Sequence, residues 1–91
     1  MIDLAARFGE NLARCRKQAR LSQEAMSYLA SLHRTEISQL ERGLRLARID
    51  TLVKLKCSLE VPADELLLGI DWTPGDYRPG GFREGGGGEA P

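Results

Sequence analysis

The sequence predicts an all-α fold, with a five-helix domain followed by a Gly/Pro-rich C-terminal tail. Before residue 70, apolar residues recur in several segments at the three- and four-residue spacing of helices with one buried face. Serine, glycine and proline separate these segments at positions typical of helix starts and stops. Beyond residue 70 the composition shifts to proline, glycine and charge. We therefore expect a domain at residues 1–70 and a largely flexible tail at residues 71–91.

The first helix is expected from about Asp3 to Ala19. Asp3 can cap it, because a carboxylate at this position accepts a hydrogen bond from a free backbone N–H of the first turn. The residues that predict its buried face are Leu4, Phe8, Leu12, Cys15 and Ala19.

A second helix is expected over about Gln23 to Ala30, because Ser22 is a favourable N-cap. The acidic residue in its first turn suits the positive end of the helix dipole. Its predicted apolar face consists of Ala25, Met26 and Leu29.

A third helix is expected to start near Arg34 and to stop at Gly43. Ile37 and Leu40 lie at helical spacing and should face the core. The side chains that remain point outward: Arg34, Thr35, Glu36, Ser38 and Gln39.

Two further helices should close the core. The fourth is expected over about Ile49 to Leu59, with a buried stripe of Ile49, Leu52, Leu55 and Leu59. The fifth is expected from Pro62, which suits a first helical position, to about Leu68, with Gly69 ending it. In this fifth helix, residues 66–68 should supply the apolar contacts.

Charge is unevenly distributed although the net formal charge is zero. Residues 1–56 hold eleven Lys or Arg against six Asp or Glu, whereas residues 57–91 hold two against seven. This asymmetry is typical of a basic binding body with an acidic tail, although a solvated surface can also produce it. A nucleic-acid partner is therefore compatible with the neutral total.

The chain lacks the residues for a metal, cofactor or catalytic site. A structural zinc ion usually needs about four closely spaced ligands, and only Cys15, Cys57 and His33 are offered. No nucleophile is accompanied by a base and its orienting partner, so we expect no enzymatic activity. We also expect a cytoplasmic protein without a membrane partner, because no secretory pattern or membrane-length apolar run is found.

Two short helices joined by a tight turn fit the major groove of double-stranded DNA. Arg34 can donate two hydrogen bonds to a guanine, Gln39 can pair with an adenine, and Thr35 can contact a thymine methyl group. Arg42 and Arg45 follow the third helix and suit phosphates.

Four motifs carry a resemblance to a known family: Leu21-Ser22-Gln23-Glu24, Leu32-His33-Arg34-Thr35, Ile37-Ser38 and Leu40-Glu41-Arg42-Gly43. Together they resemble the lambda-repressor/Cro-like, or XRE, helix-turn-helix family. The wider similarity runs from about Phe8 to Leu68. It implies a five-helix lambda-repressor-like fold that regulates transcription by binding operators, usually as a dimer.

The resemblance also implies roles for individual residues. Arg34, Thr35 and Gln39 match the base-contacting face, and Gln23 matches a glutamine that holds a phosphate. Arg16 and Glu41 match a structural ion pair between the first and third helices. His33, Glu36 and Ser38 are further candidates for facing DNA.

Several positions depart from the family pattern, among them Ser31, Glu36 and Lys56. Ser31 stands where a turn glycine is common, so this position requires either another backbone geometry or an unfavourable positive φ. Glu36 places an acid on the outward face, where it can repel phosphate or accept a hydrogen bond from a cytosine amino group.

A homodimer on a pseudo-palindromic operator is expected, because two symmetric copies read more DNA than one small module. The residues that suggest an apolar contact surface are Leu44, Leu46, Leu66, Leu67, Ile70, Trp72, Tyr77 and Phe82. Two alternatives remain: an antitoxin-like regulator whose tail also binds a protein toxin, and a protein-interaction adaptor of this fold with little DNA affinity. Glu36 and the neutral net charge favour the adaptor.

Overall fold

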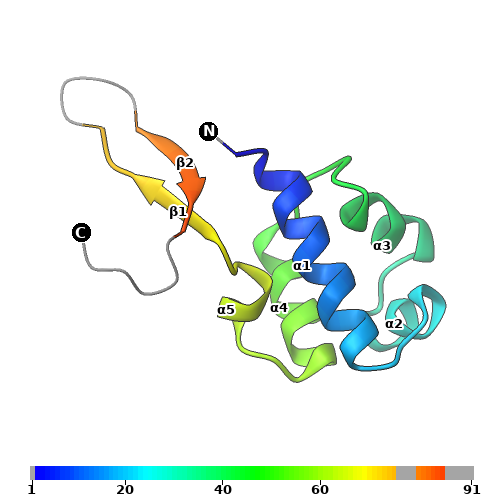
Figure 1. Ribbon diagram of the computed structural model, residues 1–91. Coiled ribbons are helices and arrows are strands. Elements are labelled where there is room, and N and C mark those ends of the chain that lie inside the picture. The colour runs from blue at the N-terminus through cyan, green and yellow to red at the C-terminus, as the bar shows by residue number, and fades with distance from the viewer. Residues whose placement is uncertain (1, 76–79, 86–91) are drawn as a thin grey trace.

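Five helices form a compact body from which a two-stranded hairpin projects (Figure 1). The computed structural model describes residues 2–75 and 80–85. The elements are α1 (Leu4–Gln18), α2 (Gln23–Ala30), α3 (Arg34–Glu41), α4 (Ile49–Leu59), α5 (Ala63–Leu66), β1 (Ile70–Thr73) and β2 (Gly81–Glu84). In Figure 1, α2 and α3 lie on one side of α1, whereas the hairpin lies at the opposite end of the molecule.

The predicted helix starts are confirmed where a cap marks them. Asp3 precedes α1 and its Oδ1 accepts a hydrogen bond from the backbone N–H of Ala6 over 3.1 Å. Ser22 precedes α2 and its Oγ accepts from the N–H of Ala25 over 3.0 Å. Ala19, predicted inside the first helix, is its exposed C-cap instead.

The core is formed by side chains from all five helices. Its central members, Leu12, Met26, Ile37, Leu40, Leu55 and Leu66, are fully buried. Ile37 and Leu40 anchor α3 as predicted, so the opposite face of that helix is directed away from the core.

Two predicted core residues are exposed instead. Leu29 is 57% exposed, because the short α2 contacts the core through Met26 and Ala30. Ile49 is 75% exposed, because α4 buries Thr51, Leu55 and Leu59 and leaves its first residue outside the contact.

The fifth helix is shorter than predicted. It covers Ala63–Leu66, and Pro62 is its N-cap rather than its first residue. Only Leu66 is buried, whereas Leu67 and Leu68 are 38% and 52% exposed. The helix ends early because the chain turns through Gly69, whose φ of 79° is unstrained only in glycine, and enters the hairpin.

The hairpin corrects the all-α prediction. β1 and β2 are antiparallel, and Ile70 pairs with Glu84, Trp72 with Phe82. The indole and phenyl rings meet edge to face with centroids 5.1 Å apart, and Ile70 packs against the core. These contacts give the segment an ordered structure that its Gly/Pro-rich composition did not indicate. The expected flexibility of residues 76–79 and 86–91 lies outside the described residues.

Polar side chains of α1 hold the turn between α5 and the hairpin. The Nδ2 of Asn11 donates to the carbonyl oxygens of Leu66 and Leu68, each over 2.9 Å, and Asn11 itself is buried. The Nη1 of Arg7 donates to the carbonyl of Gly69 over 3.2 Å. The bonds from Asn11 satisfy carbonyl groups that the end of α5 would otherwise leave unpaired.

Close approach of α1 and α3 depends on Gly9. A Cβ at this position would overlap the backbone carbonyl oxygens of Leu40 and Glu41. The missing side chain therefore allows α1 to lie directly against the end of α3.

Replacing Ser31 by glycine is expected to raise the free energy of unfolding by about 0.5 kcal/mol. Ser31 ends α2 with a φ of 54°, which costs a residue with a Cβ roughly 1–2 kcal/mol. The greater freedom of glycine in the unfolded chain offsets about 0.5–1 kcal/mol of that gain. Urea unfolding followed by circular dichroism measures the difference. Ser31→Ala is the matched control, and an equal gain in both variants would show that the backbone strain is not the cause.

Candidate nucleic-acid interface

The outward face of α3 is presented by a rigid pair of helices. α2 ends at Ala30, three residues follow, and α3 begins at Arg34 with His33 as its N-cap. The backbone N–H of Leu32 donates to the carbonyl of Ser27 over 3.0 Å, which closes the turn. With the turn closed and α3 anchored in the core, the outward side chains have a fixed direction.

A shallow depression brings together side chains that were predicted to bind phosphate and side chains that were predicted to read bases. It is lined by Gln23 from α2 and by Arg34, Thr35 and Ser38 from α3. Arg34 and Thr35 are exposed, whereas Gln23 and Ser38 are half-buried. The predicted phosphate-binding glutamine therefore lies beside two of the predicted base-reading residues.

An ion pair fastens α1 to α3 beneath this surface. The Nε and Nη2 of Arg16 donate to the two carboxylate oxygens of Glu41 over 2.6 and 3.0 Å. Their side chains are only 12% and 7% exposed. Such a bidentate geometry is among the strong hydrogen-bond arrangements in proteins. The pair that the family resemblance implied is thus present, and Glu41 faces inward.

The same carboxylate also positions Gln23. The Nε2 of Gln23 donates to Oε1 of Glu41 over 3.1 Å. Arg16 uses its remaining Nη1 for the backbone carbonyl of Leu21, just before α2, over 2.8 Å. Arg16 and Glu41 therefore connect α1, α2 and α3 at one point.

Glu41 stabilises the charged form of the Arg16 guanidinium. Its hydrogen bond, and secondly its charge, raise the pKa of Arg16 above the ordinary arginine value against the lowering effect of burial. A raised pKa means that the stabilisation is present below the ordinary pKa and is lost only as the pH rises through the raised one. The pair consequently stays intact throughout the neutral range.

Arginines surround the end of α3. Arg42 is the exposed C-cap residue of α3, and Arg45 is exposed in the loop that follows. Within residues 2–75 and 80–85, neither of them forms an ion pair, so their charges are available to an anion. Arg48, by contrast, lies 3.4 Å from Asp50.

Gln39 is half-buried and already has a partner. Its Oε1 accepts a hydrogen bond from Nη1 of Arg45 over 3.3 Å. Pairing with adenine uses both ends of the amide, and Oε1 of Gln39 has a second lone pair that can accept from the adenine amino group while the bond from Arg45 is kept.

Two candidate residues lie at the start of α3. His33 is exposed, and its side chain makes no capping hydrogen bond. Glu36 is half-buried in the first turn, where a negative charge interacts favourably with the helix dipole. Glu36 therefore has a structural reason to be acidic, independent of any contact with DNA.

The remaining candidates from the sequence are located as follows. Cys15 is buried in the core and Cys57 is exposed.

Among the described residues, none of the helices combines the length and the apolar character needed to cross a membrane.

The polar contacts of Arg7 and Asn11 with the turn after α5 were missed, because a polar residue on the edge of an apolar helix face does not indicate its partner.

The fold and this surface together define a helix-turn-helix domain whose third helix faces outward. A helix-turn-helix family model matches residues 12–66. The control protein C.BamHI of Bacillus amyloliquefaciens is 36% identical over 61 residues, which are 66% of this chain and 75% of that protein. The uncharacterized HTH-type transcriptional regulator y4dJ of Sinorhizobium fredii is 34% identical over 77 residues, covering 85% of this chain and 100% of that protein.

Solved structures show the same similarity. The restriction-modification controller protein C.AhdI from Aeromonas hydrophila superposes with a TM-score of 0.66 at 32% identity, over 68% of this chain and 94% of that one. The chain belongs to the XRE, or lambda-repressor/Cro-like, family of helix-turn-helix transcriptional regulators. It is thus a DNA-binding regulator from a non-enzymatic family.

Proposed function

We infer that this protein is a sequence-specific transcriptional regulator that acts in the cytoplasm and reads the major groove with α3. The supporting observation is the depression that brings Gln23 next to Arg34 and Thr35 on a helix pair with a fixed direction. A phosphate held by Gln23 would position the duplex, while α3 contacts the base edges.

The proposed base contacts follow from side-chain chemistry and exposure. Arg34 is exposed at the first position of α3 and can donate to O6 and N7 of a guanine. Thr35, also exposed, offers its methyl group to a thymine. Gln39 lies one turn further along the helix and would read an adenine, with Arg45 holding its Oε1 in place.

Binding energy would come mainly from phosphates. Arg42 and Arg45 follow α3 and would contact the DNA backbone without selecting a sequence. Glu36 is the opposing charge on this surface, and its half-buried position in the first turn limits its contact with phosphate.

A homodimer on a pseudo-palindromic operator completes the proposal. One domain of this size covers a short half-site, and a two-fold dimer would place a second α3 about one helical turn away. The exposed Leu44 and Leu46, which directly follow α3, offer apolar surface where such a dimer needs it. Because two similar proteins are named as control or restriction-modification controller proteins, the operator of a restriction-modification system is the first candidate DNA.

Replacing Arg42 or Arg45 by alanine should weaken binding to all DNA sequences by similar factors. Each lost phosphate contact should also reduce the slope of log K against log salt by about 0.9. Fluorescence anisotropy of a labelled duplex at several salt concentrations measures both effects. Lys17→Ala is the matched control, because it removes one positive charge from the exposed last turn of α1, outside the residues proposed to contact DNA or the second copy. Equal slopes in all three variants would contradict the phosphate role, and absent or salt-independent binding would favour the adaptor.

A further inference from the structure

We propose that the β1–β2 hairpin is a dimerisation arm that holds α4 of a second copy of this chain. The proposal rests on the homodimer proposed above and adds the surface that forms it. It makes the hairpin a binding element rather than a tail.

One face of the hairpin starts in the core and continues beyond it. Side chains alternate along a strand, so Ile70 and Trp72 lie on the same face of β1, and their cross-strand partners share that face. Ile70 packs against the core, whereas Trp72 and Phe82 are 53% and 39% exposed. The two aromatic rings therefore extend an apolar surface past the helices of their own chain.

The hairpin is fixed in direction before any partner binds. Arg7 reaches from α1 to the carbonyl of Gly69 over 3.2 Å and to the carboxylate of Glu84 over 3.4 Å. The backbone N–H of Gly85 donates to the same carbonyl over 2.9 Å. A fixed arm loses little conformational freedom on association, which favours tight binding.

Exposed apolar side chains are concentrated in the part of the sequence that follows α3. Ten large ones are exposed among the described residues, and eight of these lie between Leu44 and Phe82. Leu46 and Leu67 line one apolar groove, which connects the loop before α4 with the end of α5. Ile49 and Val53 are exposed and lie four residues apart in α4, so they form an unpartnered stripe on the first turns of that helix.

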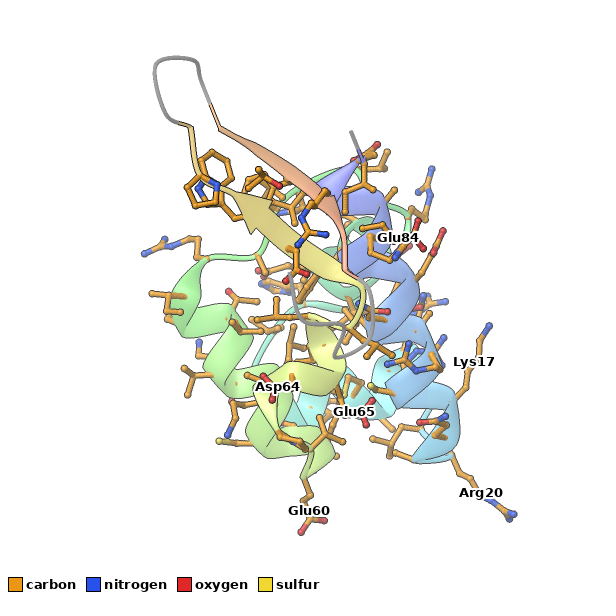
Figure 2. The ribbon with its side chains drawn as sticks, turned by 60° about the vertical axis from the view of Figure 1, so that its left-hand side comes forward. Lys17, Arg20, Glu60, Asp64, Glu65 and Glu84 are labelled. Atoms are coloured by element: carbon orange, nitrogen blue, oxygen red, sulfur yellow. The ribbon has the colours of Figure 1, made fainter. Side chains whose placement is uncertain are left out.

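Charge complementarity identifies the occupant as a second copy. A hollow between α5 and the hairpin is lined by apolar residues and by the acidic residues Asp64 and Asp71. Asp71 is already paired with Arg83 over 3.5 Å, so Asp64 carries the negative charge of this hollow that has no ion-pair partner among the described residues. Figure 2 shows Asp64 on α5, which lies below the hairpin in that view. Beside the α4 stripe, Asp50 is paired with Arg48 over 3.4 Å, whereas the exposed Lys54 next to Val53 has no ion-pair partner among the described residues.

A two-fold axis would satisfy both halves of this surface at once. In such an interface, the acidic hollow and aromatic arm of each copy face the basic, apolar α4 stripe of the other. Aromatic side chains with half of their surface exposed are typical anchors of such contacts. The surface is thus complementary to itself.

Trp72 provides the direct test, because it is the only tryptophan of the chain. Its emission and its quenching by acrylamide are measured on the full chain over a dilution series, with sedimentation velocity on the same samples. We expect the emission to shift to shorter wavelength and the quenching to fall at the concentrations where the dimer forms. A dimer in which Trp72 is quenched as in the monomer overturns the arm and leaves the homodimer standing. A chain that is monomeric both free and on operator DNA overturns both.

Substitutions test the anchor itself. Phe82→Ala should raise the dimer dissociation constant by about tenfold or more, as expected for an aromatic anchor. Leu29→Ala is the control, because Leu29 is similarly exposed but lies on α2. Equal effects of the two changes would overturn the proposal, and circular dichroism checks that both variants remain folded.

A charge exchange tests the identity of the partner surface. Lys54→Glu and Asp64→Lys should each weaken self-association, because like charges then face each other across the two-fold axis. An equimolar mixture of the two variants should dimerise about as tightly as the unmodified chain, since opposite charges are restored at both contacts. A mixture that associates no more tightly than either variant alone would overturn the pairing of the acidic hollow with α4.

Discussion

Replacing Glu41 by alanine is expected to lower the free energy of unfolding by about 3 kcal/mol, the largest effect expected for a single polar side chain here. The change leaves the guanidinium of Arg16 charged, mostly buried and without its carboxylate partner. It also removes the hydrogen bond that orients Gln23. Urea unfolding should therefore show lower stability, and the DNA affinity of the folded variant should fall as well.

Two further variants show how much of the lost stability comes from leaving a buried charge unpaired and how much from losing the contact itself. The double change Arg16→Met and Glu41→Leu removes both charges and should recover most of the stability lost in Glu41→Ala. Asp50→Ala breaks the ion pair with Arg48, in which the side chain of Arg48 is 80% exposed and that of Asp50 is 55% exposed. This change should lower the free energy of unfolding by no more than about 1 kcal/mol. If Glu41→Ala and Asp50→Ala were equally destabilising, the buried ion pair between α1 and α3 would not stabilise the fold more than an exposed pair does.

Arg34→Ala is expected to reduce discrimination at one base pair of the operator by about 1–3 kcal/mol. Arg34 is exposed at the start of α3, so the change should leave stability nearly unaltered. Competition binding with operators mutated at single positions measures the effect. Specificity should be lost at one position in each half-site and kept at the others.

The phosphate-contacting arginines supply the comparison. Arg42→Ala should weaken every competitor by the same factor, because phosphate contacts carry no sequence information. An Arg34→Ala variant that behaved in this uniform way would assign Arg34 to the DNA backbone and remove it from the base-reading set.

The helices could be predicted from the sequence because their signals are local. For α2, a cap residue and apolar spacing lie within a few positions of each other, and for α4 the apolar spacing alone was enough; both helices have the predicted bounds. The same spacing identified Ile37 and Leu40, and hence which face of α3 is exposed. The ion pair between Arg16 and Glu41 came from the family resemblance, since its members lie 25 positions apart.

Other features were missed because they depend on distant partners. The spacing that places Ile49 on the stripe of α4 cannot show that the core ends before reaching it. In the sequence, Asn11 is only a polar residue within an amphipathic helix. Its partners, the carbonyl groups of Leu66 and Leu68, lie 55 and 57 positions away. The hairpin did have a local signal, the alternation of Ile70 and Trp72 before a Pro-Gly pair, but the surrounding glycines outweighed it.

If α3 reads a specific sequence as part of a two-fold dimer, the full chain should select one consensus from random duplex DNA. We expect this consensus to be palindromic, with half-site centres about one helical turn apart, and Arg34→Ala should lose the enrichment at one position of each half-site. Absence of any enriched sequence, in a chain that is folded and binds DNA, would contradict it.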